Sequence, residues 1–474
     1  MSEDVAGVFH RPDRVAAQDE RLILLSYSLP WPEMSLVDFL RQAVGAPRVY
    51  WESEKASVGF AGYGAAAVLK AAGADRFQVI RKGVARLFDN AILEAIDAPP
   101  TVGPRLFGGF SFQAEHVPEG VWVAFPAAYF VLPRYQLTRV EGRHWLTVSH
   151  LVQVECEAYR DLQVECEAYR DLSVEGANGR VNGYASRPEG FNLPGRRLDI
   201  EYPMGAATWH RLVKDAIRRI DRGELDKVVL ARTCDVQVDQ PIDPTEVLAR
   251  LQRRYPDCYR FLIEPVLDHA FYGATPELLV EVTGSALRTV AIAGSIARGD
   301  SADADAALAQ ELMTSPKERQ EHAFVVEAIQ ASLRPLVRQL HVPDRPALRR
   351  LHNIQHLQTI IRGELAGGVG VLLAVEALHP TPAVGGVPQT PALQMIAEEE
   401  PLPRGWYASP VGWIDPEGNG LFTVAIRSAV SVRNRARLYA GAGIVADSDP
   451  EREWEETGLK FRPMLEALGQ TSDQ

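Results

Sequence analysis

The chain has 474 residues, of which 62 are acidic and 50 are basic, so its formal net charge is −12. This length is too great for one ordinary domain and fits two or three parts around a large core. With 46% apolar and 24% charged residues, the composition is that of a globular protein and excludes extended disorder and collagen-like repeats. The acidic excess argues against nucleic acid or an anionic membrane as the main partner, because both attract basic surfaces. An anionic ligand would therefore need cations placed locally.

The N-terminal residues and the cysteines carry no targeting or redox signal. The start of the chain has acidic side chains and no apolar stretch, and the uncharged run at 121–133 contains two prolines and is too short for a membrane span. We therefore expect a cytoplasmic protein. The four cysteines show no CxxC pairing, so we expect free thiols at Cys156, Cys166, Cys234 and Cys258.

The first third of the chain looks like scaffold. Residues 1–150 mix short apolar stretches with Gly and Pro turns and have few clusters of reactive side chains, so we predict an N-terminal scaffold lobe there. The ten residues QVECEAYRDL at 153–162 are repeated identically at 163–172, and a stretch rich in Gly, Asn, Arg and Pro follows. We interpret the duplication as an insertion tolerated in a surface connection and predict a linker over 151–200. Residues 201–474 would form a second domain.

Helices and strands alternate irregularly in this second part. Apolar residues at Trp209, Leu212, Val213 and Ile217 have helical spacing, and Gly223 ends the pattern. Further strands are predicted at 227–232, 278–282, 288–292, 422–430 and 437–445, and further helices at 302–333 and 450–468. The turn between the last two strands is too short for a crossover helix, which favours antiparallel pairing. The pattern predicts an α+β fold.

One lysine and one glutamate stand at the ends of strands. Only seven of the 50 basic residues are Lys, so each lysine is mildly informative. Lys227 begins an apolar strand, where loss of hydration would lower its pKa and allow the neutral amine to act as a base. The alternative is an edge-strand lysine that reaches water. Glu277 stands at the mouth of another strand, where partial burial would raise its pKa enough for general-acid work.

Two helix starts each carry a pair of glutamates three residues apart. The pairs are Glu318 with Glu321 and Glu453 with Glu456. Together they could face one Mg²⁺, which prefers oxygen ligands and keeps several waters. Either pair alone is weakly informative, because glutamates near a helix start are usually solvated and favoured by the helix dipole. Glu318 with His322 could also be half of a zinc site, but no third ligand supports it.

Other segments look suited to holding a carboxylate. The loop at 379–386, His-Pro-Thr-Pro-Ala-Val-Gly-Gly, is rigid and offers a hydroxyl, an imidazole and bare backbone. Tyr407, Arg427 and the turn at 441–443 could supply a phenol, a guanidinium and backbone amides. Taken singly, each is more readily explained by the fold than by a function.

The order of these motifs indicates a family. They are KVVLAR at 227–232, ATPELLV at 274–280, AIAGSIARG at 291–299, SPKERQEH at 315–322, HNIQHLQT at 352–359, LHPTPAVGG at 378–386, WYASPVGWID at 406–415, FTVAIRSA at 422–429, and AGAGIV with SDPEREWEETGLK at 440–460. In this order they make the chain resemble the chorismate-utilising enzymes over about 201–468. The resemblance implies large antiparallel sheets flanked by helices, an active site between the lobes, and a chorismate-binding catalytic domain at 201–474.

The resemblance also narrows the reaction. Aminodeoxychorismate synthases carry a nucleophilic lysine where this chain has Ala293, which closes that route. Ser295 and Ala383 match the pattern of isochorismate synthases, and residues 45–62 and 107–112 more loosely resemble the N-terminal half of the menaquinone type. This implies Mg²⁺-dependent interconversion of chorismate and isochorismate, an isomerase reaction, without a glutaminase partner. The alternatives are a salicylate synthase, an anthranilate synthase component, or a non-catalytic chorismate-binding relative.

The same resemblance assigns roles to residues. Lys227 would take a proton from the water that adds to ring carbon C2, and Glu277 would protonate the departing C4 hydroxyl. Glu321 and Glu456, with Glu318 and Glu453 in support, would hold the metal against the ring carboxylate. The remaining substrate contacts implied are Gly294, Ser295, His356, Thr381, Ala383, Tyr407, Arg427, Gly441, Ala442, Gly443 and Lys460.

Two residues depart from the family pattern. Ser409 stands where the family usually has Gly, and Leu421 replaces a common Glu. If the turn at 409 needs a positive φ, which Gly tolerates and Ser does not readily, Ser409 would narrow the pocket. The oligomeric state cannot be predicted from the sequence.

Overall fold

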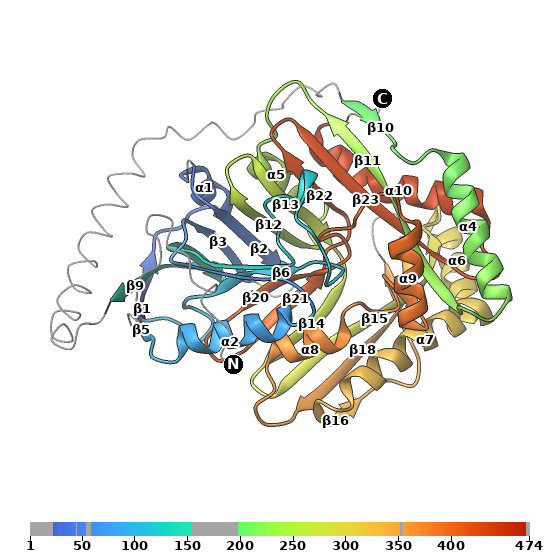
Figure 1. Cartoon of the computed structure of the whole chain (residues 1–474). Helices are drawn as coiled ribbons and strands as arrows, with labels where there is room; N and C mark the ends of the chain where they lie inside the picture. The colour runs from blue at the N-terminus through green and yellow to red at the C-terminus, as the bar shows by residue number, and fades with distance from the viewer. Residues whose placement is uncertain (1–21, 44, 54–57, 154–197, 351–353, 471–474) are drawn as a thin grey trace, which may run out of the picture.

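Two large β-sheets flanked by helices make up the protein (Figure 1). The computed structural model describes residues 22–43, 45–53, 58–153, 198–350 and 354–470. Pairing between its strands is antiparallel except between β1 (Leu22–Trp31) and β5 (Ile92–Ala95), which are parallel. The predicted α+β fold is confirmed. The duplicated segment and most of the predicted linker lie outside the described residues.

Within the described residues the first sheet has 13 strands. Its order, with bounds for the remaining strands, is β10 (Asp199–Glu201), β11 (Lys227–Gln237), β23 (Arg435–Ile444), β22 (Ser428–Val432), β13 (His269–Thr275), β12 (Tyr259–Val266), β2 (Arg48–Ser53), β3 (Val58–Tyr63), β8 (Tyr135–Val140), β9 (Arg143–Gln153), β1 and β5, and β19 (Gly386–Val387) pairs with β11 off this path.

The second sheet has 10 strands in the part of the chain that the structure describes. Its order is β16 (Val337–His341), β18 (Ile354–Leu365), β15 (Ala286–Ala297), β14 (Leu278–Thr283), β21 (Gly420–Val424), β20 (Pro410–Ile414), β6 (Leu106–Phe110), β7 (Ala128–Leu132) and β4 (Ala67–Ala71), and β17 (Ala347–Arg350) pairs with β18.

Helices cover the outer faces of both sheets. Those that contact the first sheet are α1 (Leu36–Arg41), α4 (Ala206–Asp221), α5 (Pro244–Arg254), α9 (Gln389–Glu399) and α10 (Pro450–Leu468). Those that contact the second are α2 (Arg76–Phe88), α6 (Ala302–Thr314), α7 (Pro316–Leu333) and α8 (Val371–Leu378), and a short 3-10 helix, η2 (Gly120–Trp122), contacts β22. None of the helices in the described part of the chain is long and apolar enough to cross a bilayer.

Both halves of the sequence contribute to both sheets. Strand β2 of the N-terminal half pairs with β12, and β6 pairs with β20. At the first of these seams Arg260 lies directly opposite Glu52, and its Nε and one terminal nitrogen donate to the same carboxylate oxygen at 2.9 and 2.7 Å. Both side chains are fully buried. The predicted lobe at 1–150 therefore has no sheet of its own.

The helix predicted from Trp209 to its end at Gly223 is confirmed as α4. Trp209, Leu212 and Val213 are buried against the first sheet, and the chain leaves the helix at Gly223, whose φ is +73°. That left-handed backbone favours glycine, which has no Cβ to clash. Cys234 and Cys258 are buried free thiols, as predicted.

One predicted helix and one predicted strand are each divided in two. The helix at 302–333 breaks at Ser315, because a residue that precedes proline avoids helical backbone angles, and Ser315 then caps α7 by accepting from the Glu318 amide. The strand at 422–430 becomes β21 and β22, which lie in different sheets. Arg427 lies between them with a φ of +52°. This turn carries the chain from one sheet to the other.

Candidate active site

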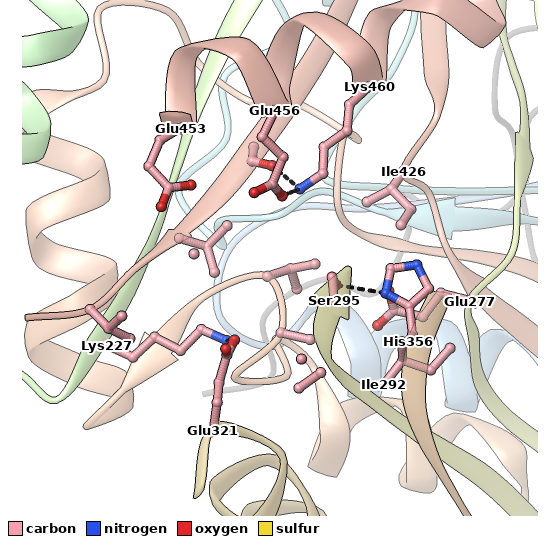
Figure 2. A pocket seen from close by; sticks show the side chains of 18 of the residues that line it. Lys227, Glu277, Ile292, Ser295, Glu321, His356, Ile426, Glu453, Glu456 and Lys460 are labelled. Atoms are coloured by element: carbon pink, nitrogen blue, oxygen red, sulfur yellow. Dashed lines mark hydrogen bonds and ion pairs between the residues drawn. The ribbon is translucent and has the colours of Figure 1, made fainter. Parts of the chain in front are cut away.

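A cavity of about 230 Å³ lies between the two sheets beside α7 and α10. All of its lining residues come from the second part of the chain. It includes the following residues of the predicted site: Lys227, Glu277, Gly294, Ser295, Glu318, Glu321, His356, Ala383, Tyr407, Arg427, Gly441, Gly443, Glu453, Glu456 and Lys460. Figure 2 shows the proposed base and acid on opposite sides of this cavity. The structure thus brings almost the whole predicted set together.

The carboxyl of Glu277 is buried, with the residue 9% exposed. It follows Pro276 at the start of β14, and its backbone amide donates to Thr275 Oγ1 at 3.2 Å, which fixes the entry to the strand. Burial raises the pKa of Glu277 to about 7, although Arg349, Lys227, Arg427 and Lys460 each oppose the rise. A carboxyl that is partly protonated near neutral pH is suited to give a proton to a leaving group.

Lys227 is the first residue of β11 and is only 4% exposed. It does not reach out to water: its Nζ lies 2.5 Å from Glu321 Oε1 of α7. Strand β23 runs beside it, and a Cβ at Gly443 would lie 2.9 Å from Lys227 Cε. The amine therefore lies between Glu321 of α7 and the backbone of β23.

The two glutamate pairs lie on facing helices. Ser315 and Pro316 start α7, and Asp449 and Pro450 start α10, so that each helix begins beside the cavity and presents its first turns to it. Figure 2 shows Glu453 and Glu456 on the α10 side and Glu321 on the other. The glutamates of the two helices face the same cavity, as predicted.

Burial and like charge act on the four carboxyls. Burial and the neighbouring Glu321 raise the pKa of Glu318, and burial and Glu456 raise the pKa of Glu453 to about 7. Burial also opposes ionisation of Glu456, but Lys460, 2.5 Å away, brings the pKa of Glu456 below its ordinary value. The raised pKa values of Glu318 and Glu453 thus reflect, in part, repulsion from the second carboxylate of each pair.

The four glutamates have the chemistry that a hard divalent cation requires, but their carboxylates lie too far apart to coordinate one ion together. Carboxylate oxygens are the ligands that Mg²⁺ prefers, and the crowding within each pair would be relieved by a cation. Within the described residues, however, no group of three or more acidic, His or Cys side chains is close enough to hold an ion. The structure therefore shows two pairs that face one cavity, and not a closed metal cluster.

His356 and Ser295 form a hydrogen-bonded pair on the acid side. His356 Nδ1 lies 2.7 Å from Ser295 Oγ, and the two residues are directly opposite on β18 and β15. Burial, with Arg427, Lys460 and Arg349, lowers the pKa of His356 to about 3. The imidazole is therefore neutral at physiological pH and can offer a hydrogen bond without adding charge.

Glycines shape the walls on either side. Gly294 interrupts the regular pairing of β15 with β18 and has a φ of +76°, and a Cβ there would lie 3.1 Å from Glu318 Oε2. A Cβ at Gly441 would lie 3.2 Å from the Tyr407 hydroxyl. A side chain at either position would displace a group that the substrate is predicted to meet.

Two predicted contacts do not line the cavity. Ala442 lies between Gly441 and Gly443 on β23, and strand alternation turns its side chain into the core, where it is fully buried. Thr381 is also buried, and its carbonyl accepts from the amides of Val384 and Gly385. It closes the loop that presents Ala383 to the cavity.

The condition under which Ser409 would narrow the pocket is not met. The residue with left-handed backbone in this turn is Ala408, at a φ of +60°, so the turn makes no such demand on Ser409. Ser409 is buried, its Oγ donates to the Tyr407 carbonyl at 3.3 Å, and it is not part of the cavity lining. Leu421 lies buried in β21, also away from the cavity.

Sequence reasoning missed some residues at the cavity. Lys317, Ile292 and Ile426 line it. The scarcity of lysine, together with the position of Lys317 inside the SPKERQEH motif, could have identified the first of these. The apolar residues carry no signal, because an isoleucine on a strand usually packs in the core.

The N-terminal half reaches the cavity indirectly, through Tyr407. The Tyr407 ring stacks on Tyr439, with centroids 5.0 Å apart and an angle of 16° between the ring planes. Tyr439 accepts from Trp122 Nε1 at 2.9 Å and donates to the Pro403 carbonyl at 3.0 Å. Burial raises the pKa of Tyr407 to about 12, so its phenol stays neutral.

Comparison with known proteins places the chain in a family. Residues 11–469 match a protein family described as "Chorismate binding enzyme". The salicylate biosynthesis isochorismate synthase of Pseudomonas aeruginosa is 37% identical over 98% of this chain and 94% of its own length. The isochorismate synthase MenF of Bacillus subtilis is 32% identical over 98% of this chain and 97% of its own.

A solved structure agrees with these relatives. The menaquinone-specific isochorismate synthase MenF from Escherichia coli superimposes with a TM-score of 0.76 at 27% identity, covering 96% of this chain and 97% of that one. Anthranilate synthase component I of Streptococcus pneumoniae, at 21% identity and a TM-score of 0.69, shares the fold. The chain belongs to the chorismate binding enzymes.

Proposed function

We propose that the protein is an isochorismate synthase, an isomerase that interconverts chorismate and isochorismate. The observation that carries this proposal is that a buried lysine and a buried glutamic acid face one cavity from opposite sides. The full-length relatives named isochorismate synthase support it. Ala293 lines the cavity where the lysine nucleophile of aminodeoxychorismate synthases would be, which supports addition of water and not of an enzyme side chain.

The reaction needs a base and an acid on opposite faces of the ring. Water adds to C2 while Lys227 takes one of its protons, the ring double bonds shift, and the C4 hydroxyl leaves as water with the proton of Glu277. One water enters and one leaves, so the step is an isomerisation. Exchange with solvent then returns the proton held by Lys227 to Glu277.

The other lining residues position the dianionic substrate. Arg427 and Tyr407 line the cavity and would hold one carboxylate with a guanidinium and a neutral phenol. Glu321 and Glu456, with Glu318 and Glu453, would hold Mg²⁺, which when bound would neutralise the second carboxylate and fix the face of attack. Lys460, which also lines the cavity and donates to the Gly441 carbonyl at 2.8 Å, keeps Glu456 ionised and in place.

Menaquinone synthesis is the proposed use of the product. MenF of Bacillus subtilis matches 98% of this chain, whereas DhbC of the same organism matches 54% of it. The relative from Pseudomonas aeruginosa, which is named for salicylate biosynthesis, also matches 98% of this chain. The structural match to the menaquinone-specific enzyme of Escherichia coli over 96% of the chain favours menaquinone. Cytoplasmic location and the lack of a glutaminase partner stay predictions.

Product analysis tests the activity directly. The pure protein is incubated with chorismate and Mg²⁺, with and without ammonium salt, and the products are separated chromatographically. We expect isochorismate in equilibrium with chorismate. Salicylate with pyruvate would indicate a salicylate synthase, anthranilate an anthranilate synthase, and tight binding without any product a non-catalytic relative; each of these would overturn the proposal.

Metal removal should abolish this activity. Without a cation the glutamate pairs repel each other and the substrate, so we expect turnover to disappear in EDTA and to return with excess Mg²⁺, as measured by isochorismate formation. Glu453→Gln should weaken the response to Mg²⁺, whereas Glu455→Gln, at an exposed position of the same helix, should leave it unchanged. Full turnover in EDTA would refute the metal assignment.

A further inference from the structure

Arg349 lies beside the acid side of the cavity without belonging to any predicted motif. It is in β17, and the register of β17 with β18 places it directly opposite His356, while Arg350 is opposite Gln355. Directly opposed residues of antiparallel strands share a face of the sheet. Arg349 therefore shares the cavity-facing side with His356. Arg350 lies on the other side, where its Nε is 3.7 Å from Asp305 Oδ2.

The surroundings of Arg349 leave its charge available to Glu277. Its Nε is buried and has no hydrogen-bond partner among the described residues. Lys227 and Lys460 are already paired with Glu321 and Glu456. Of the positive charges that act on Glu277, that of Arg349 has the largest effect. It also acts on the neighbouring His356.

The positive charge of Arg349 stabilises Glu277 most strongly after Glu277 has given its proton to the leaving hydroxyl. When Glu277 gives its proton to the leaving hydroxyl, it becomes a buried anion, and desolvation makes such an anion costly. A guanidinium nearby with a spare N–H lowers that cost and so favours delivery of the proton. The charged and titratable groups that face Glu277 from the elements around it are Lys227, Arg349, Arg427 and Lys460, with His356 and Tyr407 as neutral neighbours.

We propose that Arg349 is a positioning residue for the acid step, which stabilises the carboxylate of Glu277 and holds it ready to cycle between its protonated and ionised forms. The catalytic part of this inference, the role of Arg349 in the acid step, rests on the proposed function. The effect of Arg349 on Glu277, by contrast, is a property of the free protein and can be measured without substrate.

Titration of Glu277 tests the charge effect. Infrared difference spectra between pH values show the carbonyl stretch of a protonated carboxyl, and the band absent in Glu277→Gln is assigned to Glu277. In Arg349→Gln we expect the titration midpoint to move upward by about half to one pH unit, because a cation has been removed. Arg349→Lys should remain near wild type, and Arg350→Gln should not change. An unmoved midpoint in Arg349→Gln, or an equal shift in Arg350→Gln, overturns the proposal.

Turnover tests the consequence. With the carboxylate less stabilised, kcat for isochorismate formation in Arg349→Gln should fall, with KM little changed, when it is measured below pH 6, where Glu277 is protonated in both proteins. The fall should reach at most about three- to tenfold, the rate equivalent of that shift. Arg349→Lys should restore most of the loss, and thermal unfolding of each variant checks that it is folded. A shifted midpoint with unchanged kcat would refute the positioning role. If wild type forms no isochorismate, the proposed function fails, while the titration still decides whether Arg349 acts on Glu277.

Discussion

Glu277→Gln should bind chorismate and fail to turn it over. The amide has nearly the same shape as the protonated acid, so the buried site is kept, but it cannot give a proton to the C4 hydroxyl. General-acid catalysis is worth roughly 100- to 10,000-fold, and kcat should fall by this amount with little change in the chorismate dissociation constant. Isochorismate formation measures the first quantity, and calorimetric titration with chorismate measures the second.

A matched control lies on the same strand. Glu281, also in β14, is paired with Arg288 at 2.7 Å and is not part of the cavity lining. Glu281→Gln removes one carboxylate from the same element and should leave kcat close to wild type. If Glu277→Gln kept near-normal turnover, or if both variants lost activity equally, Glu277 would have no part in the proton transfer.

The same replacement should stabilise the fold at higher pH. Burial raises the pKa of Glu277 from the ordinary 4.5 to about 7, so the folded protein holds a proton that the unfolded chain gives up between these values. The stability linked to this group is therefore complete below pH 4.5 and is lost as the pH rises through 7. The shift corresponds to about 3 kcal/mol. Denaturant unfolding should show equal stability of variant and wild type in acid, and a more stable variant above neutral pH.

The sequence predicts the site better than it predicts the paths of the strands. Lys227 and Glu277 are candidates because they stand at the ends of apolar strands, and the order of the motifs then assigns their roles by resemblance. The start of α10 is predicted by its Asp and Pro. These are local signals, which the chain carries within a few residues. The sharing of both sheets by both halves is not local, because it depends on which strand β2 and β6 select as neighbours.

The same limit explains the missed and misread residues. The segment 422–430 is mostly apolar apart from Thr423, Arg427 and Ser428, and nothing in its period shows that the chain changes sheets at Arg427. Arg349 is brought opposite His356, on the cavity side of the sheet, only by the register of β17 on β18. Residues 441–443, predicted as a turn that offers backbone amides, lie instead within β23, where the side chain of Ala442 is buried in the core.

Lys227→Arg should abolish turnover although it keeps the positive charge. A guanidinium stays protonated in proteins and cannot accept a proton from water, whereas an amine can. The larger head group must also fit beside Glu321 and the backbone at Gly443, where the lysine side chain already fills the space. We expect kcat to fall roughly 100- to 10,000-fold. Lys214→Arg, at an exposed position of α4, makes the same exchange away from the cavity and should have no effect.

Chemical rescue separates the loss of a base from a disturbed site. Lys227→Ala leaves a space in the cavity wall, and small primary amines added to the solution should restore part of the turnover in proportion to their concentration. Rescue that increases with amine basicity would show that the missing group accepts a proton. Equal rescue by potassium ions, or full activity in Lys227→Arg, would instead mean that Lys227 only balances the charge of Glu321, and another group would have to activate the water.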